Sequence, residues 1–258
     1  MHRPSIGGIH AMELVSNHSF PRHTHDEYGI GVVLSGAQRS WSGVGQVESV
    51  PGDVITVNPG ELHDGLAING TPRHWRIIYF DPMVLTKEFL FDSTREIEFR
   101  SPSLRDPVLG RSVNRLFDRL IDGAERLSVE EMLLDIVEQL TSSDLRLPDE
   151  SRQLTPSVAK ARARIDDDPA SQITLAELAE LSGVSRYQIV RAFAREMGTT
   201  PHAYVVQCRV RLARRFLLNG ETLAGAAQRA GFADQSHMTR AFVRQFGITP
   251  GRYVGDRH

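Results

Sequence analysis

The 258-residue sequence lacks several features that define whole classes of protein. It has one cysteine, Cys208, so no disulfide can form within the chain. No apolar run approaches the roughly 20 residues of a transmembrane helix, and no signal peptide opens the sequence. These absences argue against a disulfide-stapled secreted domain and a membrane protein. We therefore expect a cytoplasmic protein with no membrane partner.

The net charge of −2 hides an uneven distribution. Residues 155–258 carry 15 lysines and arginines, nearly all of them arginine, against 9 acidic residues, for a net charge of +6. Residues 1–154 carry 15 against 23, for a net charge of −8. A basic second part favours nucleic acid as its partner, although many solvated helices are also rich in arginine.

The last 85 residues contain an internal repeat, in which residues 174–205 match residues 222–254. The matched pairs are Thr174 and Thr222, Gly183 and Gly231, Arg191 and Arg240, Phe193 and Phe242, Gly198 and Gly247, Pro201 and Pro250, and Tyr204 and Tyr253. Chance does not place so many identities at a period of 48 to 49 residues.

Each copy predicts a helix, a glycine turn and a second helix. Thr174 and Thr222 are expected to cap the first helices, and Gly183 and Gly231 to end them in the left-handed conformation. The second helices are predicted to open at Ser185 and Asp234 and to bury Ile189, Ala192, Phe193, Met238, Ala241 and Phe242. This order is the helix-turn-helix pattern.

The outward faces of the second helices distinguish a solvated core helix from a DNA-reading helix. Solvated faces usually mix glutamate with lysine, and these faces carry no acidic residue. Arginine can bind guanine, glutamine can pair with adenine, and serine or threonine with several bases. We therefore predict that double-stranded DNA is bound by Arg186, Tyr187, Gln188, Arg191, Arg195, Gln235, Ser236, His237, Thr239, Arg240 and Arg244.

Residues 201–220, between the copies, predict one long helix that begins at Pro201 and ends at Gly220. Roughly 19 helical residues span about 28 Å. The one-turn spacing between successive major grooves on one face of DNA is about 34 Å, so one chain could present both reading helices to adjacent grooves. The arginines of this segment are expected to contact phosphate or face solvent: Arg209, Arg211, Arg214 and Arg215.

The last 100 or so residues resemble the DNA-binding domain of AraC/XylS-type transcription regulators. The resemblance rests on residues 185–193, 231–242 and 247–253, with Ile189 in a leucine position and Met238 in a phenylalanine position. It implies that both reading helices enter major grooves and that bases are contacted by Tyr187, Arg191, Gln235, Ser236, Thr239 and Arg240. Because the copies differ in their outward residues, we expect two different half-sites and a directional operator.

Residues 1–85 predict a β-sandwich or barrel, because β-branched runs such as "YGIGVVLSG" and "HWRIIYF" alternate with turn residues. The segments "RHTHDEY" and "PGDVITVNPGELHDG" resemble the cupin-like sensor domain that commonly precedes such a DNA-binding domain. The predicted fold class is therefore α+β. It comprises a cupin-like barrel or sandwich, helices, and an all-α C-terminal domain with two helix-turn-helix motifs.

The sensor domain offers two alternatives for its site. In a strand, His23, His25 and Glu27 share one face, and with His63 they could bind zinc, nickel, iron or manganese. Only Asp26 separates His25 from Glu27, whereas metal-binding cupins place three or four residues there, so a small-molecule pocket is favoured. Its candidate lining, suited to a small polar, amine-bearing effector such as an amino acid, is His23, His25, Glu27, Trp41, His63 and Trp75. Both tryptophans could equally be core residues.

Two amphipathic stretches follow at about residues 105–140, one of which carries Val113, Leu116 and Phe117 on one face. They are predicted either to pack on the barrel or to form a homodimer interface. Residues 141–156 have the polar, proline-containing character of a linker. We therefore predict an effector-binding and dimerisation domain at 1–140, a linker at 141–156 and a DNA-binding domain at 157–258.

The sequence as a whole predicts a ligand-responsive, sequence-specific DNA-binding transcription regulator rather than an enzyme. RNA polymerase is a further candidate partner, and activation is the working expectation. One alternative is a metal-dependent cupin enzyme with an accessory DNA-binding tail, which requires stoichiometric metal and turnover of a substrate. The other is a binding module whose front domain dimerises and senses nothing. The residues leave open the effector, the operator and the sign of regulation.

Overall fold

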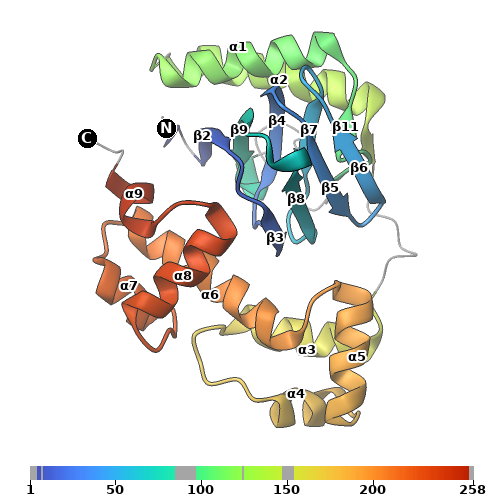
Figure 1. The fold of residues 1–258 in the computed structure, drawn as a ribbon, viewed down its shortest axis with the longest axis vertical. Helices are drawn as coiled ribbons and strands as arrows, with labels where there is room; N and C mark the ends of the chain where they lie inside the picture. The colour runs from blue at the N-terminus through green and yellow to red at the C-terminus, as the bar shows by residue number, and fades with distance from the viewer. Residues whose placement is uncertain (1–4, 7, 85–96, 124, 147–153, 256–258) are drawn as a thin grey trace. The chain divides into compact units, whose positions relative to one another are not determined.

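The computed structural model describes residues 1–258 except 1–4, 7, 85–96, 124, 147–153 and 256–258. The chain divides into two compact units, Met1–Pro148 and Asp149–His258. The first unit contains the strands and helices α1 and α2, and the described part of the second is helical (Figure 1). The predicted α+β class, with the β-domain first, is confirmed.

Two antiparallel sheets form the first unit, with strand orders β1-β2-β9-β4-β7-β11 and β3-β8-β5-β6. The larger sheet consists of β1 (Ser5–Ile6), β2 (Ile9–Ser16), β9 (Arg73–Phe80), β4 (Tyr28–Ser35), β7 (Val54–Val57) and β11 (Ser103–Leu104). The smaller sheet consists of β3 (Phe20–His23), β8 (His63–Ala67), β5 (Gln38–Ser42) and β6 (Gly45–Ser49). A 3-10 turn at Ile68–Gly70 joins β8 to β9, and β10 (Glu98–Phe99) pairs with β12 (Leu145–Arg146).

Strand β9 shows how the larger sheet separates two cores. Ile78 packs in a cluster with residues of α1 and α2. Trp75, Ile77 and Tyr79 belong instead to a cluster that includes Phe20 of the smaller sheet. Because side chains alternate along a strand, this second set points between the two sheets. We call the space between the two sheets the barrel interior.

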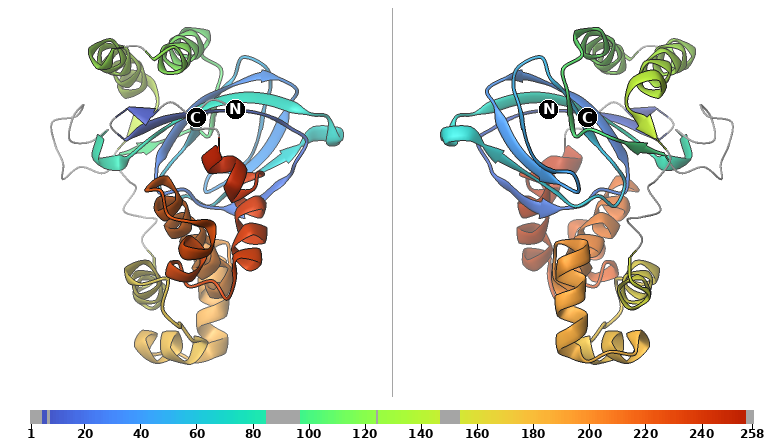
Figure 2. Two further views of the ribbon diagram at one scale, coloured as in Figure 1. Left: turned by 90° about the vertical axis from the view of Figure 1, so that its left-hand side faces the viewer. Right: turned by 90° about the vertical axis from the view of Figure 1, so that its right-hand side faces the viewer.

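Helices α1 (Pro107–Ile121) and α2 (Arg126–Ser143) lie against the outer face of the larger sheet (Figure 2). The Asp106 carboxylate caps α1 by accepting the N–H groups of the next turn at 2.9 and 3.0 Å. On the predicted apolar faces, Val113 and Leu133 are fully buried in the core that the helices share with the sheet. Of the two predicted roles, these faces therefore perform the packing role.

The first unit extends beyond the predicted boundary at residue 140. Helix α2 continues to Ser143, and β12 then pairs with β10. The buried Asp144 stabilises this ending, because its carbonyl oxygen accepts the Arg100 N–H at 3.0 Å. The predicted linker at 141–156 is thus too long at its start, and its residues 147–153 lie outside the described residues.

The second unit contains the two predicted helix-turn-helix motifs (Figure 1). Helix α3 (Pro156–Asp167) precedes the first motif, which consists of α4 (Leu175–Ser182) and α5 (Arg186–Met197). Helix α6 (Pro201–Leu218) leads to the second motif, α7 (Leu223–Arg229) and α8 (Gln235–Phe246), and α9 (Pro250–Gly255) follows. The two helix pairs and the long helix between them are confirmed.

Local capping sets the ends of these helices. The side chains of Thr174 and Thr222 accept N–H groups in the first turns of α4 and α7, and that of Asp234 does the same for α8. Gly183 and Gly231 have φ of +69° and +79°, the left-handed conformation that ends helices. The predicted caps and turn glycines are therefore confirmed.

The arginines of α6 correct one expectation. Arg214 is buried and donates to the Tyr253 hydroxyl, and Arg209 donates to the carbonyl oxygen of Pro169 at 2.7 Å. Both arginines stabilise the domain itself, because a buried guanidinium needs hydrogen-bond partners. Of the four arginines on this helix, Arg215 is the exposed one. The sequence could not show this, since both partners are distant in the chain.

Candidate DNA-binding helices and sensor site

Helix α5 has an outward face of basic and aromatic side chains. Ile189 and Phe193 are fully buried, whereas Tyr187 is 70% exposed. The Arg191 guanidinium lies 5.7 Å from the centre of the Tyr187 ring, so a cation–π contact orders the two side chains. The predicted DNA-contacting residues of this helix are all exposed: Arg186, Tyr187, Gln188, Arg191 and Arg195.

Helix α8 repeats the arrangement with different outward residues. Met238 and Phe242 are fully buried in place of Ile189 and Phe193. Gln235, Ser236, Arg240 and Arg244 are exposed, and His237 and Thr239 are half-buried. No carboxylate among the described residues lies within ion-pair distance of Arg240 or Arg244. This helix therefore presents two guanidinium groups that no described carboxylate neutralises.

Three of the predicted DNA contacts are also used within the protein. The side-chain oxygen of Gln188 accepts the N–H of Ser185 at 2.9 Å and completes a capping box. Arg195 donates to Glu196 at 2.7 Å. The His237 ring packs edge-on against Phe232, with ring centres 5.2 Å apart. The contacts of Gln188 and Arg195 use hydrogen-bonding groups that these side chains could otherwise offer to DNA, and the packing of His237 holds its ring against the domain.

In the first unit, three predicted site residues meet in the barrel interior. His23 at the end of β3 pairs with His63 at the start of β8, and their ring centres are 4.5 Å apart. The His25 ring lies 4.9 and 5.1 Å from these two rings. One ring nitrogen of each histidine lies within 4.8 Å of the others. We call these three side chains the histidine cluster.

Hydrogen bonds and burial determine which ring nitrogens of the histidine cluster carry hydrogen and whether the rings are charged. Nδ1 of His23 donates to the Pro21 carbonyl oxygen at 2.7 Å, and Nδ1 of His63 to that of Glu61 at 3.1 Å, which leaves Nε2 as the acceptor. Burial, together with nearby His63, lowers the pKa of His23 to about 3. Burial also lowers the pKa of His63 to about 4. Both imidazoles are therefore neutral at neutral pH, which is the form that binds metal ions.

Glu27 is not part of the histidine cluster. Strand β3 ends at His23 and the chain bends at residues 26–27, so the strand alternation expected to align Glu27 with the histidines does not reach it. Its carboxylate lies 3.4 Å from Nδ1 of His10, whose ring stacks on Tyr79 at 5.1 Å. The three-histidine, one-carboxylate set predicted from the sequence is therefore corrected to three histidines.

The two tryptophans separate onto opposite faces. Trp75 faces the barrel interior, where its ring meets that of Phe20 edge-on at 6.0 Å. Trp41 shares a strand face with Arg39, which forms an exposed ion pair, and the Arg22 guanidinium lies 3.8 Å from the centre of its ring. Strand alternation thus turns Trp41 outward, and its predicted place beside the histidines is corrected.

Comparison with known proteins agrees with this two-part architecture. A family model described as an AraC-like ligand binding domain matches residues 9–137, half of the chain, and a helix-turn-helix domain model matches residues 178–255. The chain is 31% identical over 224 residues to the uncharacterized HTH-type transcriptional regulator YbfI of Bacillus subtilis, covering 85% of this chain and 81% of YbfI. The chain belongs to the AraC family of transcription regulators. It is a regulator with a ligand-binding domain and a DNA-binding domain.

Solved structures share the fold of this AraC-family chain. ToxT of Vibrio cholerae has a TM-score of 0.65 over 99% of this chain and 100% of its own, at 11% identity. ToxT with a bound unsaturated fatty acid has a TM-score of 0.63, with 95% and 94% of the two chains covered.

The transcriptional activator NphR of Rhodococcus is 39% identical over 84 residues, which are 32% of this chain and 25% of NphR. None of the helices in the described residues has the length and apolarity to cross a membrane.

Three interior residues of this AraC-family domain were not predicted from the sequence. His10, Arg73 and Tyr79 face the barrel interior. A signal for two of them was present in the segment "RHWRIIYF", because Arg73, Trp75 and Tyr79 occupy alternate positions of one strand.

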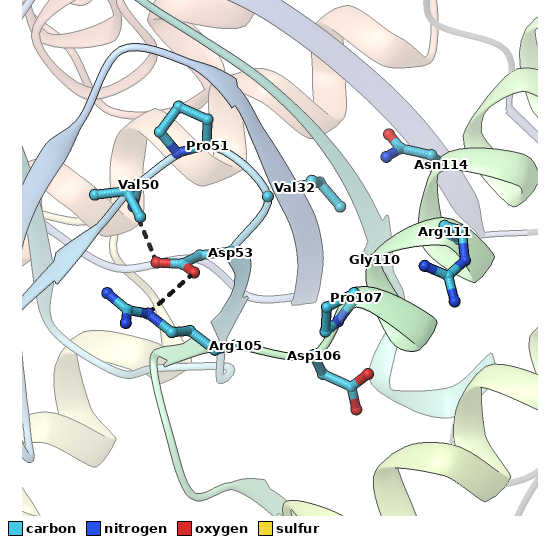
Figure 3. Close-up of a pocket in the computed structure, with 11 residues that line it drawn as sticks. Val32, Val50, Pro51, Asp53, Arg105, Asp106, Pro107, Gly110, Arg111 and Asn114 are labelled. Atoms are coloured by element: carbon cyan, nitrogen blue, oxygen red, sulfur yellow. Dashed lines mark hydrogen bonds and ion pairs between the residues drawn. The ribbon is translucent and has the colours of Figure 1, made fainter.

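A separate cleft lies between the β6–β7 turn and the start of α1 (Figure 3). Its volume is about 460 Å³. Asp53 pairs with Arg105 at 3.7 Å on one side of it, and Arg111 and Asn114 of α1 lie on the other (Figure 3). None of the effector residues predicted from the sequence lines this cleft.

Proposed function

We propose that this regulator recognises promoter DNA through the outward faces of α5 and α8. The observation that carries the proposal is that two matched helices bury equivalent residues and expose arginine-bearing faces without acidic residues. Arg191 and Arg240 occupy equivalent positions, whereas Tyr187 is replaced by Ser236. The two half-sites therefore differ in sequence, and the operator has a direction.

The linking helix supports binding of both motifs to one DNA segment. Its 18 residues correspond to about 27 Å of helix, close to the one-turn groove spacing of about 34 Å. Arg215 is the arginine of this helix that would contact phosphate, because it is exposed while Arg209 and Arg214 bind within the domain.

Replacing Arg240 tests the proposed face. Arg240→Ala should weaken specific binding by roughly 1–3 kcal/mol and relax preference at one base position, as expected for loss of an arginine–base contact. Binding is measured by fluorescence anisotropy on operator fragments in which each position is varied in turn. Arg39→Ala is the control, because it removes the same charge from an exposed arginine of the first unit. Unchanged affinity and base preference in Arg240→Ala would show that α8 does not read DNA.

We also propose that an effector in the barrel interior changes DNA binding, so that the chain works as a cytoplasmic regulator and not as an enzyme. An effector can shift the equilibrium only if it binds the two states of the protein with different affinity. The relative NphR is named a transcriptional activator. Activation by this chain would add RNA polymerase as a partner. In vitro transcription with and without the effector determines the sign of regulation.

A homodimer is part of this proposal. Because α1 and α2 use their buried faces against the sheet, a dimer would have to use other surface, where Leu127 and Leu134 are 66% and 45% exposed. Sedimentation of the full chain measures the state directly. Leu134→Lys should then shift a dimer towards monomer, whereas a monomeric parent protein would exclude the dimer.

The histidine cluster supports a second candidate role, a divalent metal site. Nε2 of His23 and His63 and a ring nitrogen of His25 would hold the ion, and imidazole donors favour zinc, nickel or iron. The position of Glu27 away from the cluster removes the carboxylate that favoured manganese. A bound ion would supply a Lewis-acidic centre to which an effector oxygen could bind.

Elemental analysis tests the metal candidate. Protein purified without chelator should carry about one ion per chain, and His63→Ala should lose it, while the exposed Lys160→Ala should retain it. A metal-free protein that also fails to take up added zinc, nickel or iron would exclude the metal site. The same result would remove the basis of a metal-dependent cupin enzyme.

A further inference from the structure

Arg73 is a buried cation in the barrel interior. It begins β9, is 1% exposed, and reaches across to the smaller sheet, where Nη2 donates to the Gly65 carbonyl oxygen at 3.0 Å. Nη2 also donates to the His18 carbonyl oxygen at 3.2 Å. Its guanidinium carbon lies 4.9 Å from the centre of the Trp75 ring and 5.6 Å from that of Phe20. The side chain is thus fixed in position at one end of the interior.

The remaining donors of Arg73 have no partner in the part of the chain that the structure describes. Nε and Nη1 are buried and make no hydrogen bond, and no carboxylate of the described residues lies within ion-pair distance. Burial lowers the pKa of Arg73 to about 10, so the group still carries its charge at neutral pH. An isolated buried charge is costly to a fold, and retaining one is explained when an anion binds beside it.

Two neighbours of Arg73 fit the same conclusion. Nε2 of His18 is also buried without a hydrogen-bond partner, and the His18 ring packs edge-on against Phe20 at 4.9 Å. At Gly65, a β-carbon would lie in ordinary van der Waals contact with Nη2 of Arg73, at 3.4 Å, and any longer side chain would extend beside the guanidinium. The absence of a side chain at Gly65 keeps space around the guanidinium.

We infer that Arg73 binds the carboxylate of the effector, with His18 as a second polar contact and the Phe20 and Trp75 rings against its apolar or aromatic body. The inference rests on the proposed function, because it names the chemical class that the regulator senses. It also changes the effector expected from the sequence. The Glu27 carboxylate already contacts His10, whereas the Arg73 guanidinium has no counter-charge among the described residues and therefore selects an acid rather than an amine.

The alternative is that Arg73 only ties the two sheets together through its bonds to Gly65 and His18. A fluorescence titration separates the two roles. The chain has two tryptophans, so Trp41→Phe leaves Trp75 as the sole tryptophan, and its ring lies beside Arg73. Phenylacetate is titrated against phenylacetamide, which has the same ring and no charge, in this background and in the same background carrying Arg73→Met or Arg73→Lys.

Phenylacetate should change Trp75 emission with saturation and bind at least about tenfold more tightly than phenylacetamide, because the charge-assisted contact is made by the acid alone. Arg73→Met should abolish this preference and Arg73→Lys should retain part of it. The comparison of acid with amide needs no change at Arg73, so it holds even if Arg73→Met fails to fold. Equal binding of the two probes, or an undiminished preference for the acid in Arg73→Met, would overturn the inference.

The inference would also be overturned if phenylacetate, acetate and decanoate left Trp75 emission unchanged up to about 10 mM. Even weak charge-assisted binding should be detectable at that concentration. Binding of the same preparations to operator DNA is measured in parallel. Intact DNA binding without acid binding would remove this inference alone. Acid binding without specific DNA binding would instead contradict the proposed function.

Discussion

The two helix-turn-helix motifs bury equivalent positions, but their outward faces differ in charge. Ile189 and Met238 are both fully buried at equivalent places. On α5 Arg195 is paired with Glu196, whereas the residue of α8 equivalent to Glu196 is Gln245, which is buried. Packing therefore fixes the inward residues of both copies, while the outward residues are free to differ. The second motif keeps more of its positive charge available.

The turn glycines of the two motifs also differ, although both have positive φ. A β-carbon at Gly183 would meet nothing within 4 Å. A β-carbon at Gly231 would lie 2.3 Å from the carbonyl oxygen of Ala170, which is far inside contact distance. The first glycine is therefore needed for its backbone conformation alone, and the second is needed for conformation and for space.

The largest expected effect tests this difference between the glycines. Gly183→Ala should lower the free energy of unfolding by about 1 kcal/mol, the cost of a left-handed alanine. Gly231→Ala should cost more than about 3 kcal/mol, because the backbone of Ala170 must also move. Urea unfolding of the full chain, followed by circular dichroism, measures both. Equal losses would show that the two turns are interchangeable.

A smaller effect concerns the paired and unpaired arginines. Arg244→Ala should weaken DNA binding by about tenfold, whereas Arg195→Ala should change it by about twofold or less, because Glu196 already offsets that charge. Glu196→Gln makes α5 resemble α8 and should strengthen binding, while its amide oxygen can still accept the hydrogen bonds from Thr155. Anisotropy titrations at several salt concentrations measure the affinities and the salt dependence. Weaker binding by Glu196→Gln would contradict this account of the two faces.

The smallest effect concerns the caps of the reading helices. The Asp234 carboxylate accepts the His237 N–H at 2.7 Å, and the Ser185 hydroxyl accepts the Gln188 N–H at 3.2 Å. Alanine at either position should cost about 1 kcal/mol, and more at Asp234, where a charge also meets the helix dipole. Asp234→Asn is the matched control, since it keeps the acceptor. Thermal unfolding measures the order, and a larger loss for Ser185→Ala would reverse it.

The DNA-binding half was predicted from the sequence almost residue by residue, because its determinants are local. Caps such as Thr174 and Asp234 act within one turn, and helical spacing alone separates buried Phe193 from exposed Arg191. The internal repeat then supplied a second copy of the same pattern. The arginines that bind groups distant in the chain, such as Arg209 and Arg214, escaped prediction.

The sensor half shows what the sequence could not decide. Its composition and turns predict the sheets, and its motif predicts that His23, His25 and His63 belong together. The bend that separates Glu27 from them depends on how β3 meets β4. The approach of Arg73 to Gly65 depends on the packing of one sheet on the other.

Sequence patterns alone therefore suffice to predict the family, the two domains and the outward faces of α5 and α8. Strand packing turns Trp41 outward, sets Glu27 beside His10 and leaves Arg73 without a counter-charge among the residues that the structure describes. The physical reason is the range of the interactions. Helix caps and faces are set by residues a few positions apart, whereas the interior of a barrel is assembled from strands distant in the sequence, whose register and bends select the neighbours.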